Sequence, residues 1–103
     1  MAKREVIDIL KKYITLLRAE GISVDKAFLY GSYLSNTAAE ESDIDLLLVI
    51  DDENDDYLAG KAWSLTHKVS SKIEPFLVGK DRFYENENSP LINSVKLSGL
   101  EII

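Results

Sequence analysis

The sequence predicts a mixed α/β (α+β) fold in which helices pack on a mixed sheet of three to four strands. Apolar residues recur at helical spacing over residues 3–20. Residues 43–50 then give the strongest strand pattern, since no polar residue follows Asp45. A strand that is apolar on both sides lies inside a sheet with both faces covered. Helical and strand-like segments alternate along the rest of the chain, which is typical of one mixed sheet.

The first elements have clear boundaries. The helix over 3–20 is expected to end at Gly21, a favourable C-terminal residue. Residues 27–30 predict a short buried strand. A short helix over 32–39 is expected to follow it.

The middle of the chain predicts a crossover. Residues 51–56 carry five acids and read as a solvated loop and helix start, because acids favour helix N-termini. A helix over 55–69 then has an apolar stripe on one side. Residues 72–78 predict a third strand. Pro75 lacks an N–H group, so this strand is expected at an edge or at a bulge.

The last part of the chain gives weaker patterns. Lys80 and Arg82 are interpreted as loop charges after the third strand. A polar loop with a capping residue precedes Pro90, which suits the first turn of a helix. That helix is expected to end at Gly99, and residues 100–103 can add a short last strand.

Size and composition exclude several classes of protein. The 103 residues, 46% of them hydrophobic, correspond to one small domain over 1–103. The absence of cysteine excludes disulfides and thiolate metal sites. A net charge of −6 argues against general nucleic-acid binding. No signal peptide or membrane-spanning run is visible, so we expect a cytoplasmic protein that does not interact with membranes.

Two short motifs indicate the chemistry. Gly31 and Ser32 follow an apolar run, and Asp43 and Asp45 open the next one. Side chains alternate across a strand, so the two acids point to the same face and repel each other. A divalent metal is the usual compensation, and a Gly-Ser turn can cradle phosphates through its N–H groups. Together the motifs indicate phosphoryl or nucleotidyl transfer.

A third acid is expected to join the pair. If Gly31-Ser32 and Asp43 meet, the first two strands are antiparallel, whereas the crossover helix makes the second and third strands parallel. Parallel neighbours begin at the same end of a sheet, which places Glu74 beside Asp45. Two metal ions could then bridge a triphosphate and the attacking oxygen. Glu74 would either complete the metal site or accept the proton of the attacking hydroxyl.

The spacing of these motifs resembles a known family. Gly31-Ser32, ten intervening residues and then Asp43-x-Asp45 resemble the signature of the DNA-polymerase-β-like nucleotidyltransferases. The size is similar to that of their minimal branch, the MNT proteins. The resemblance implies that Gly31 and Ser32 bind the nucleotide and that Asp43, Asp45 and Glu74 are catalytic metal ligands.

The resemblance also implies a function. Many MNT proteins are similar to antitoxins encoded beside HEPN-domain RNase toxins, and some transfer AMP from ATP to a tyrosine of the toxin. By this resemblance we expect a nucleotidyltransferase that uses ATP and two Mg²⁺ ions, with a HEPN-type toxin as partner. Two features depart from the family pattern. Residues 33–37 include no basic residue, and the third acid is a glutamate followed by Pro75.

Other functions stay open at this stage. The chain could be a binding module with weak catalysis that neutralises its partner by contact, or a nucleotidyltransferase acting on a small molecule or on RNA. Homo- or hetero-oligomers are both compatible with the sequence. Lys61 on the crossover helix could reach phosphate, although a solvated helix lysine is the simpler interpretation.

Overall fold

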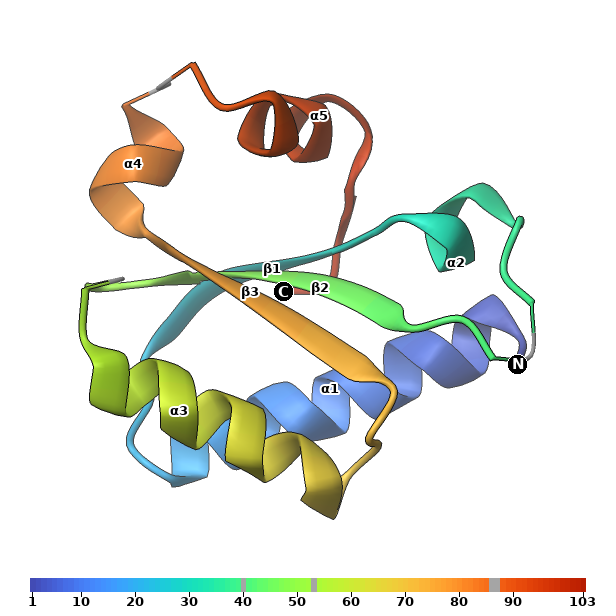
Figure 1. Cartoon of the computed structure of the whole chain (residues 1–103), viewed down its shortest axis with the longest axis horizontal. Coiled ribbons are helices and arrows are strands. Elements are labelled where there is room, and N and C mark those ends of the chain that lie inside the picture. The colour runs from blue at the N-terminus through green and yellow to red at the C-terminus, as the bar shows by residue number, and fades with distance from the viewer. Residues whose placement is uncertain (40, 53, 86–87) are drawn as a thin grey trace.

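The computed structural model describes residues 1–39, 41–52, 54–85 and 88–103. Over these residues the chain forms a four-stranded sheet in the order β3-β2-β1-β4, with helices on both faces (Figure 1). In chain order the elements are α1 (Lys3–Ala19), β1 (Val24–Tyr30), α2 (Ser32–Ser35), β2 (Ile44–Ile50), α3 (Asp56–Leu65), the 3-10 helix η1 (Thr66–Lys68), β3 (Ile73–Gly79), α4 (Lys80–Tyr84), α5 (Pro90–Ser98) and β4 (Leu100–Glu101).

The strand directions are those that the sequence predicts. β1 and β2 are antiparallel, whereas β2 and β3 are parallel and are joined through α3. β3 is an edge strand, which confirms the position expected for Pro75. Proline has no N–H group to donate to a neighbouring strand, so it is tolerated at the edge of a sheet. β4 pairs antiparallel with β1 and forms the opposite edge.

Both faces of β2 are covered. One face contributes to a core with α1 and α3, through Ile44, Leu46, Leu48 and Ile50. The other face packs Leu47 and Val49 into a second cluster, which includes side chains from α4 and α5. In Figure 1, α1 and α3 accordingly lie below the sheet, and α4 and α5 lie above it. The alternation of side chains therefore assigns every residue of β2 to one of two faces.

The helix boundaries follow recognisable capping chemistry. Gly21 has φ +89° and follows the end of α1, as expected for a residue that leaves a helix in the left-handed region. The Asp55 carboxylate caps α3 by accepting from two backbone N–H groups of its first turn, at 3.0 and 3.2 Å. Ser89 caps α5, with Pro90 in its first turn. These starts and the end at Gly21 agree with the sequence predictions.

Several predicted boundaries are wrong. β1 begins three residues before the expected strand 27–30, because Val24 is buried and pairs with Ile50. The helix expected over 32–39 ends at Ser35, since Asn36 adopts the left-handed conformation with φ 60°. The helix expected over 55–69 changes to the 3-10 helix η1 after Leu65.

The segment after β3 is also corrected. Lys80 and Arg82, interpreted as loop charges, belong to α4. This helix forms because it carries Phe83, whose ring stacks on Phe28 with the centroids 5.4 Å apart. The predictions that fall on residues 40, 53 and 86–87 lie outside the described residues. Over the described part of the chain, no helix combines the length and apolarity needed to cross a membrane.

Candidate active site

The three acids expected to cluster lie in neighbouring positions of the sheet. Asp45 is the register partner of Glu74 across the parallel pair β2 and β3. Asp43 precedes Asp45 by two residues and therefore points to the same face. This face is the one on which Leu47 and Val49 contact the cluster of α4 and α5. The two parallel strands thus bring together the carboxyls of Asp45 and Glu74, which are 29 residues apart in the sequence.

The acids interact strongly enough to change their proton affinities. Burial, and then the charge of Asp43, raise the pKa of Asp45 above its usual value. The charge of Asp43 is the main cause that raises the pKa of Glu74, followed by burial, a hydrogen bond to Asp43 and the charge of Asp45. All of these causes act in the same direction, because each one disfavours the charged form of Glu74. The three acids therefore concentrate negative charge at this edge of the sheet.

Gly31 fits closely against this cluster. Its backbone has φ 79° and ψ −152°, a region that only glycine adopts readily. A Cβ atom at this position would lie 2.2 Å from Oδ2 of Asp45, far inside any permitted contact. The absence of a side chain at Gly31 therefore allows the turn to approach the carboxylate of Asp45 directly.

Ser32 begins α2 immediately after this turn. The carbonyl of Gly31 accepts from the N–H groups of Leu34 and Ser35, each at 3.1 Å. Within the described residues no side chain caps α2. Its first N–H groups can therefore donate to a ligand. The structure thus places Gly31 against Asp45, and Ser32 directly follows it at the start of α2.

One cation near α2 was missed by sequence reasoning. Lys3 at the start of α1 donates from Nζ to the carbonyl of Leu34 at 3.0 Å. The two residues are 31 positions apart, and no local pattern links them. Residues 33–37 themselves carry no basic side chain.

The second residue that sequence reasoning missed is Tyr30. It is the register partner of Asp45 across β1 and β2. Burial, the charge of Asp45 and then the charge of Glu74 raise the pKa of its phenol. The sequence did contain a signal for this role. Tyr30 directly precedes Gly31 at the end of a strand expected to be antiparallel to that of Asp45, and opposite side chains of such a pair share one face.

The donor set suits a hard cation. Among the described residues, no group of three or more acid, histidine or cysteine side chains is arranged to hold a metal ion. The carboxyls of Asp43 and Glu74 are instead joined by a hydrogen bond, next to Asp45. Carboxylate oxygens are the ligands that Mg²⁺ prefers, and a cation would relieve the repulsion between these like charges. The acids are therefore of the chemical type that Mg²⁺ binds, whereas the described side chains are not arranged around one common point.

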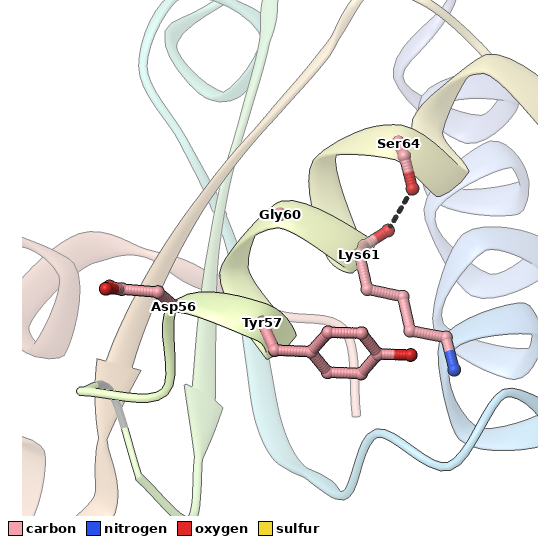
Figure 2. A pocket seen from close by; sticks show the side chains of 5 residues that line it. All are labelled: Asp56, Tyr57, Gly60, Lys61 and Ser64. Atoms are coloured by element: carbon pink, nitrogen blue, oxygen red, sulfur yellow. Dashed lines mark hydrogen bonds between the residues drawn. The ribbon is translucent and has the colours of Figure 1, made fainter.

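Lys61 does not reach this site. It belongs to α3, on the other face of the sheet, and its Nζ donates to the carbonyl of Glu20 at 2.7 Å. Figure 2 shows Lys61 beside Tyr57, with the ammonium 5.8 Å from the ring centroid. An open pocket of about 420 Å³ lies here, lined by Asp56, Tyr57, Gly60, Lys61 and Ser64. The interpretation of Lys61 as a helix-surface lysine agrees with this position.

The burial of Asp45 and the nearby charge of Asp43 predict a gain in stability when Asp45 is neutralised. Asp45 binds a proton more readily in the folded than in the unfolded chain, because its folded pKa is raised. The free energy of unfolding therefore falls as the pH rises from about 3.8, the ordinary pKa, through the raised value. Asp45→Asn is expected to raise Tm at pH 7 without Mg²⁺ by about 2–4 °C and to remove this fall.

Thermal unfolding of both proteins between pH 3 and pH 8 tests this expectation. Asp52→Asn is a matched control, since Asp52 is an exposed acid beyond the opposite end of β2. Added Mg²⁺ should raise the Tm of the wild type more than that of Asp45→Asn. Equal pH dependence in the wild type and Asp45→Asn would contradict the proposed repulsion.

A comparison with known protein families assigns the chain to a class. The family model described as "Polymerase beta, Nucleotidyltransferase" matches residues 5–99. The chain therefore belongs to the polymerase-β-like nucleotidyltransferases. No curated protein is significantly similar in sequence.

Two solved structures share the fold. One is a chain of a toxin–antitoxin crystallised with AMP-PNP, with a TM-score of 0.63 and 22% identity. The match covers 89% of the present chain and 71% of that chain. The other is a candidate nucleotidyltransferase from Sulfolobus solfataricus, with a TM-score of 0.60 and 11% identity, covering 84% and 78% of the two chains.

Proposed function

We propose that this chain transfers AMP from ATP, in a Mg²⁺-dependent reaction, to a tyrosine hydroxyl of a HEPN-type toxin and thereby acts as its antitoxin. The observation that carries the proposal is the register of the parallel strands. It places Glu74 beside Asp45, on the face to which Asp43 also points. Gly31 approaches the same carboxylate from the other neighbouring strand.

Each residue of the candidate site has its own proposed role in the reaction. Asp43 and Asp45 would hold Mg²⁺, with Glu74 as a third ligand or as the proton acceptor. When bound, the metal supplies charge neutralisation for the triphosphate and for the leaving pyrophosphate. The N–H groups at Gly31 and Ser32 would bind the β- and γ-phosphates. No covalent bond to the chain is needed, so its residues act by positioning and electrostatics.

The transfer step balances simply. The oxygen of the acceptor hydroxyl forms a bond to the α-phosphorus of ATP, and the bond from that phosphorus to the pyrophosphate oxygen breaks. The hydroxyl proton is accepted by the carboxylate of Glu74. Glu74 is exposed on the edge strand β3, so a hydroxyl carried by another molecule can approach it from outside.

The partner part of the proposal has separate support. One structural neighbour belongs to a toxin–antitoxin that was crystallised with a nucleotide analogue, AMP-PNP. A nucleotide site and a protein partner in that complex are consistent with both halves of the proposal. The match covers most of both chains, although at 22% identity it shows the fold alone.

Radiolabel transfer tests the function. The chain is incubated with a HEPN-type toxin, Mg²⁺ and ATP labelled at the α-phosphate, and the same reaction is repeated with γ-labelled ATP. We expect label on the toxin from α-labelled ATP only, together with loss of its RNase activity. A toxin that is neutralised without acquiring label would contradict the enzymatic part of the proposal.

A contact inhibitor is the second candidate. Two observations favour it: residues 33–37 have no cation for phosphate, and the described acids form no group arranged for a metal. The variant Asp43→Asn/Asp45→Asn separates the two functions. It should still neutralise the toxin if binding alone is sufficient, and it should fail if AMP transfer is required.

A different acceptor is the third possibility in the same assay. Replacing the toxin by RNA with a free 3′ end, or by an aminoglycoside, tests a nucleic-acid or small-molecule substrate. We expect no transfer to RNA, because the chain carries a net charge of −6 that disfavours a polyanion. Transfer of label to the RNA or to the aminoglycoside would show that this molecule, and not the toxin, is the acceptor.

A further inference from the structure

Tyr30 extends the row of acids across a third strand. It is the register partner of Asp45 across β1 and β2, and Asp45 is the partner of Glu74 across β2 and β3. Side chains directly opposite one another on neighbouring strands share a face. The three residues therefore form one row, with Asp45 in the middle and Tyr30 and Glu74 on either side.

The ring and the hydroxyl of Tyr30 have different surroundings. The half-buried side chain packs against the second core cluster, to which Phe28 and Phe83 also belong. The phenol interacts electrostatically with Asp45 and Glu74. In the part of the chain that the structure describes, no residue forms a hydrogen bond with the hydroxyl of Tyr30. Packing thus fixes the ring, while the O–H donor stays available beside the acids.

The row also separates two sides of the site. Tyr30 directly precedes Gly31 and Ser32, the residues placed here at the phosphates of the nucleotide. Glu74 lies on the opposite side of Asp45, where the acceptor hydroxyl would approach. Tyr30 is therefore on the nucleotide side of the row. Residues 33–37 carry no cation, so a neutral donor on this side would add a phosphate contact that this loop does not supply through charge.

We propose that the hydroxyl of Tyr30 is a further nucleotide-contacting group, which donates a hydrogen bond to a phosphate oxygen of the bound triphosphate. The proposal rests on the proposed nucleotidyltransferase function and assigns one more contact in the same site. A tyrosine phenol is protonated, and hence a donor, at neutral pH. A neutral donor does not compete with Mg²⁺ for the carboxylates.

The variant Tyr30→Phe removes the hydroxyl and keeps the ring. Tyr33→Phe is the matched control, because Tyr33 is 4% exposed and belongs to the core on the other face of the sheet. Its buried hydroxyl has no hydrogen-bond partner among the described residues. Affinity for a non-transferable ATP analogue is measured in Mg²⁺ by calorimetry. We expect about tenfold weaker binding for Tyr30→Phe and no change for Tyr33→Phe.

Inorganic tripolyphosphate separates phosphate from nucleoside contacts. Tyr30→Phe should weaken tripolyphosphate and the ATP analogue by the same factor. Weaker binding of the ATP analogue alone would overturn the phosphate contact in favour of a nucleoside contact. Two further readouts exclude a merely structural role: the Tm and the affinity for Mg²⁺ alone should match the wild type, and a change in either would overturn the assignment.

Failure of this inference is distinguishable from failure of the proposed function. If the wild type binds the analogue and Tyr30→Phe binds it equally well, only the role of Tyr30 is overturned. If the wild type binds neither the analogue nor tripolyphosphate in Mg²⁺, the nucleotidyltransferase function fails and the inference fails with it. Ring resonances of Tyr30 in tyrosine-labelled wild-type protein give a second measurement. They should shift on adding tripolyphosphate, whereas those of Tyr33 should not.

Discussion

Replacing both Asp43 and Asp45 by asparagine is expected to reduce AMP transfer by at least about 1000-fold. Asparagine keeps the shape of each side chain and removes its charge, so Mg²⁺ loses two anionic ligands. A 1000-fold loss corresponds to about 4 kcal/mol of transition-state stabilisation, which is within the range expected for a lost metal site. The fold should survive, because Asp43 is exposed and Asp45 is only partly buried.

Initial rates of transfer from α-labelled ATP measure this effect. The matched control is Asp51→Asn/Asp52→Asn, which removes the same charge beyond the other end of β2. Asp51 forms a surface ion pair with Lys80 at 3.1 Å, so the control also costs little stability. Equal losses in both double variants would show that net charge matters rather than the position of the acids, and this would contradict the assigned site.

Gly31→Ala is expected to lower stability by about 2–3 kcal/mol and transfer by about 100-fold. The added methyl group would lie 2.2 Å from Oδ2 of Asp45, so the carboxylate or the turn must move. The backbone at Gly31 also adopts a conformation with φ 79° that alanine rarely takes. A shift of the turn would move the N–H groups proposed to bind phosphate away from the acids. The transfer rate should therefore fall by more than the loss of folded protein alone would cause.

Gly21→Ala separates these two causes. Gly21 also has a positive φ, +89°, but nothing lies within 4 Å of an added Cβ. It should lose only the backbone part, about 1 kcal/mol, and keep full activity. Urea unfolding gives the stabilities, and transfer rates at 20 °C give the activities. Full transfer activity in Gly31→Ala would contradict the close contact between the turn and Asp45.

Much of the fold could be predicted because its local signals agree. β2 is apolar on both sides and proved to be an internal strand with two covered faces. Pro75 marked an edge strand, since a missing N–H group has a direct geometric consequence. Strand directions followed from connection lengths, and they placed Asp45 and Glu74 at the same end of the sheet, where the structure pairs them in register. The juxtaposition of the acids was thus deducible from topology.

The remaining features depend on packing between distant segments. α4 has five residues and no periodic pattern, and it is stabilised by the contact of Phe83 with Phe28. The close approach of Gly31 to Asp45 requires coordinates, because a glycine after a strand indicates only a turn. The hydrogen bond between Glu74 and Asp43 depends on side-chain rotamers, which no sequence pattern specifies.

Calorimetric titration of a non-transferable ATP analogue, with and without Mg²⁺, tests the central claim most directly. The wild type and Asp45→Asn are compared at pH 7. The claim is that Asp45 and Glu74, on β2 and β3, belong to a metal-dependent nucleotide site. In that case the wild type binds the analogue only in Mg²⁺, and Asp45→Asn binds it at least tenfold more weakly than the wild type does. Equal affinity in the two proteins, or binding by the wild type that is independent of Mg²⁺, would contradict it.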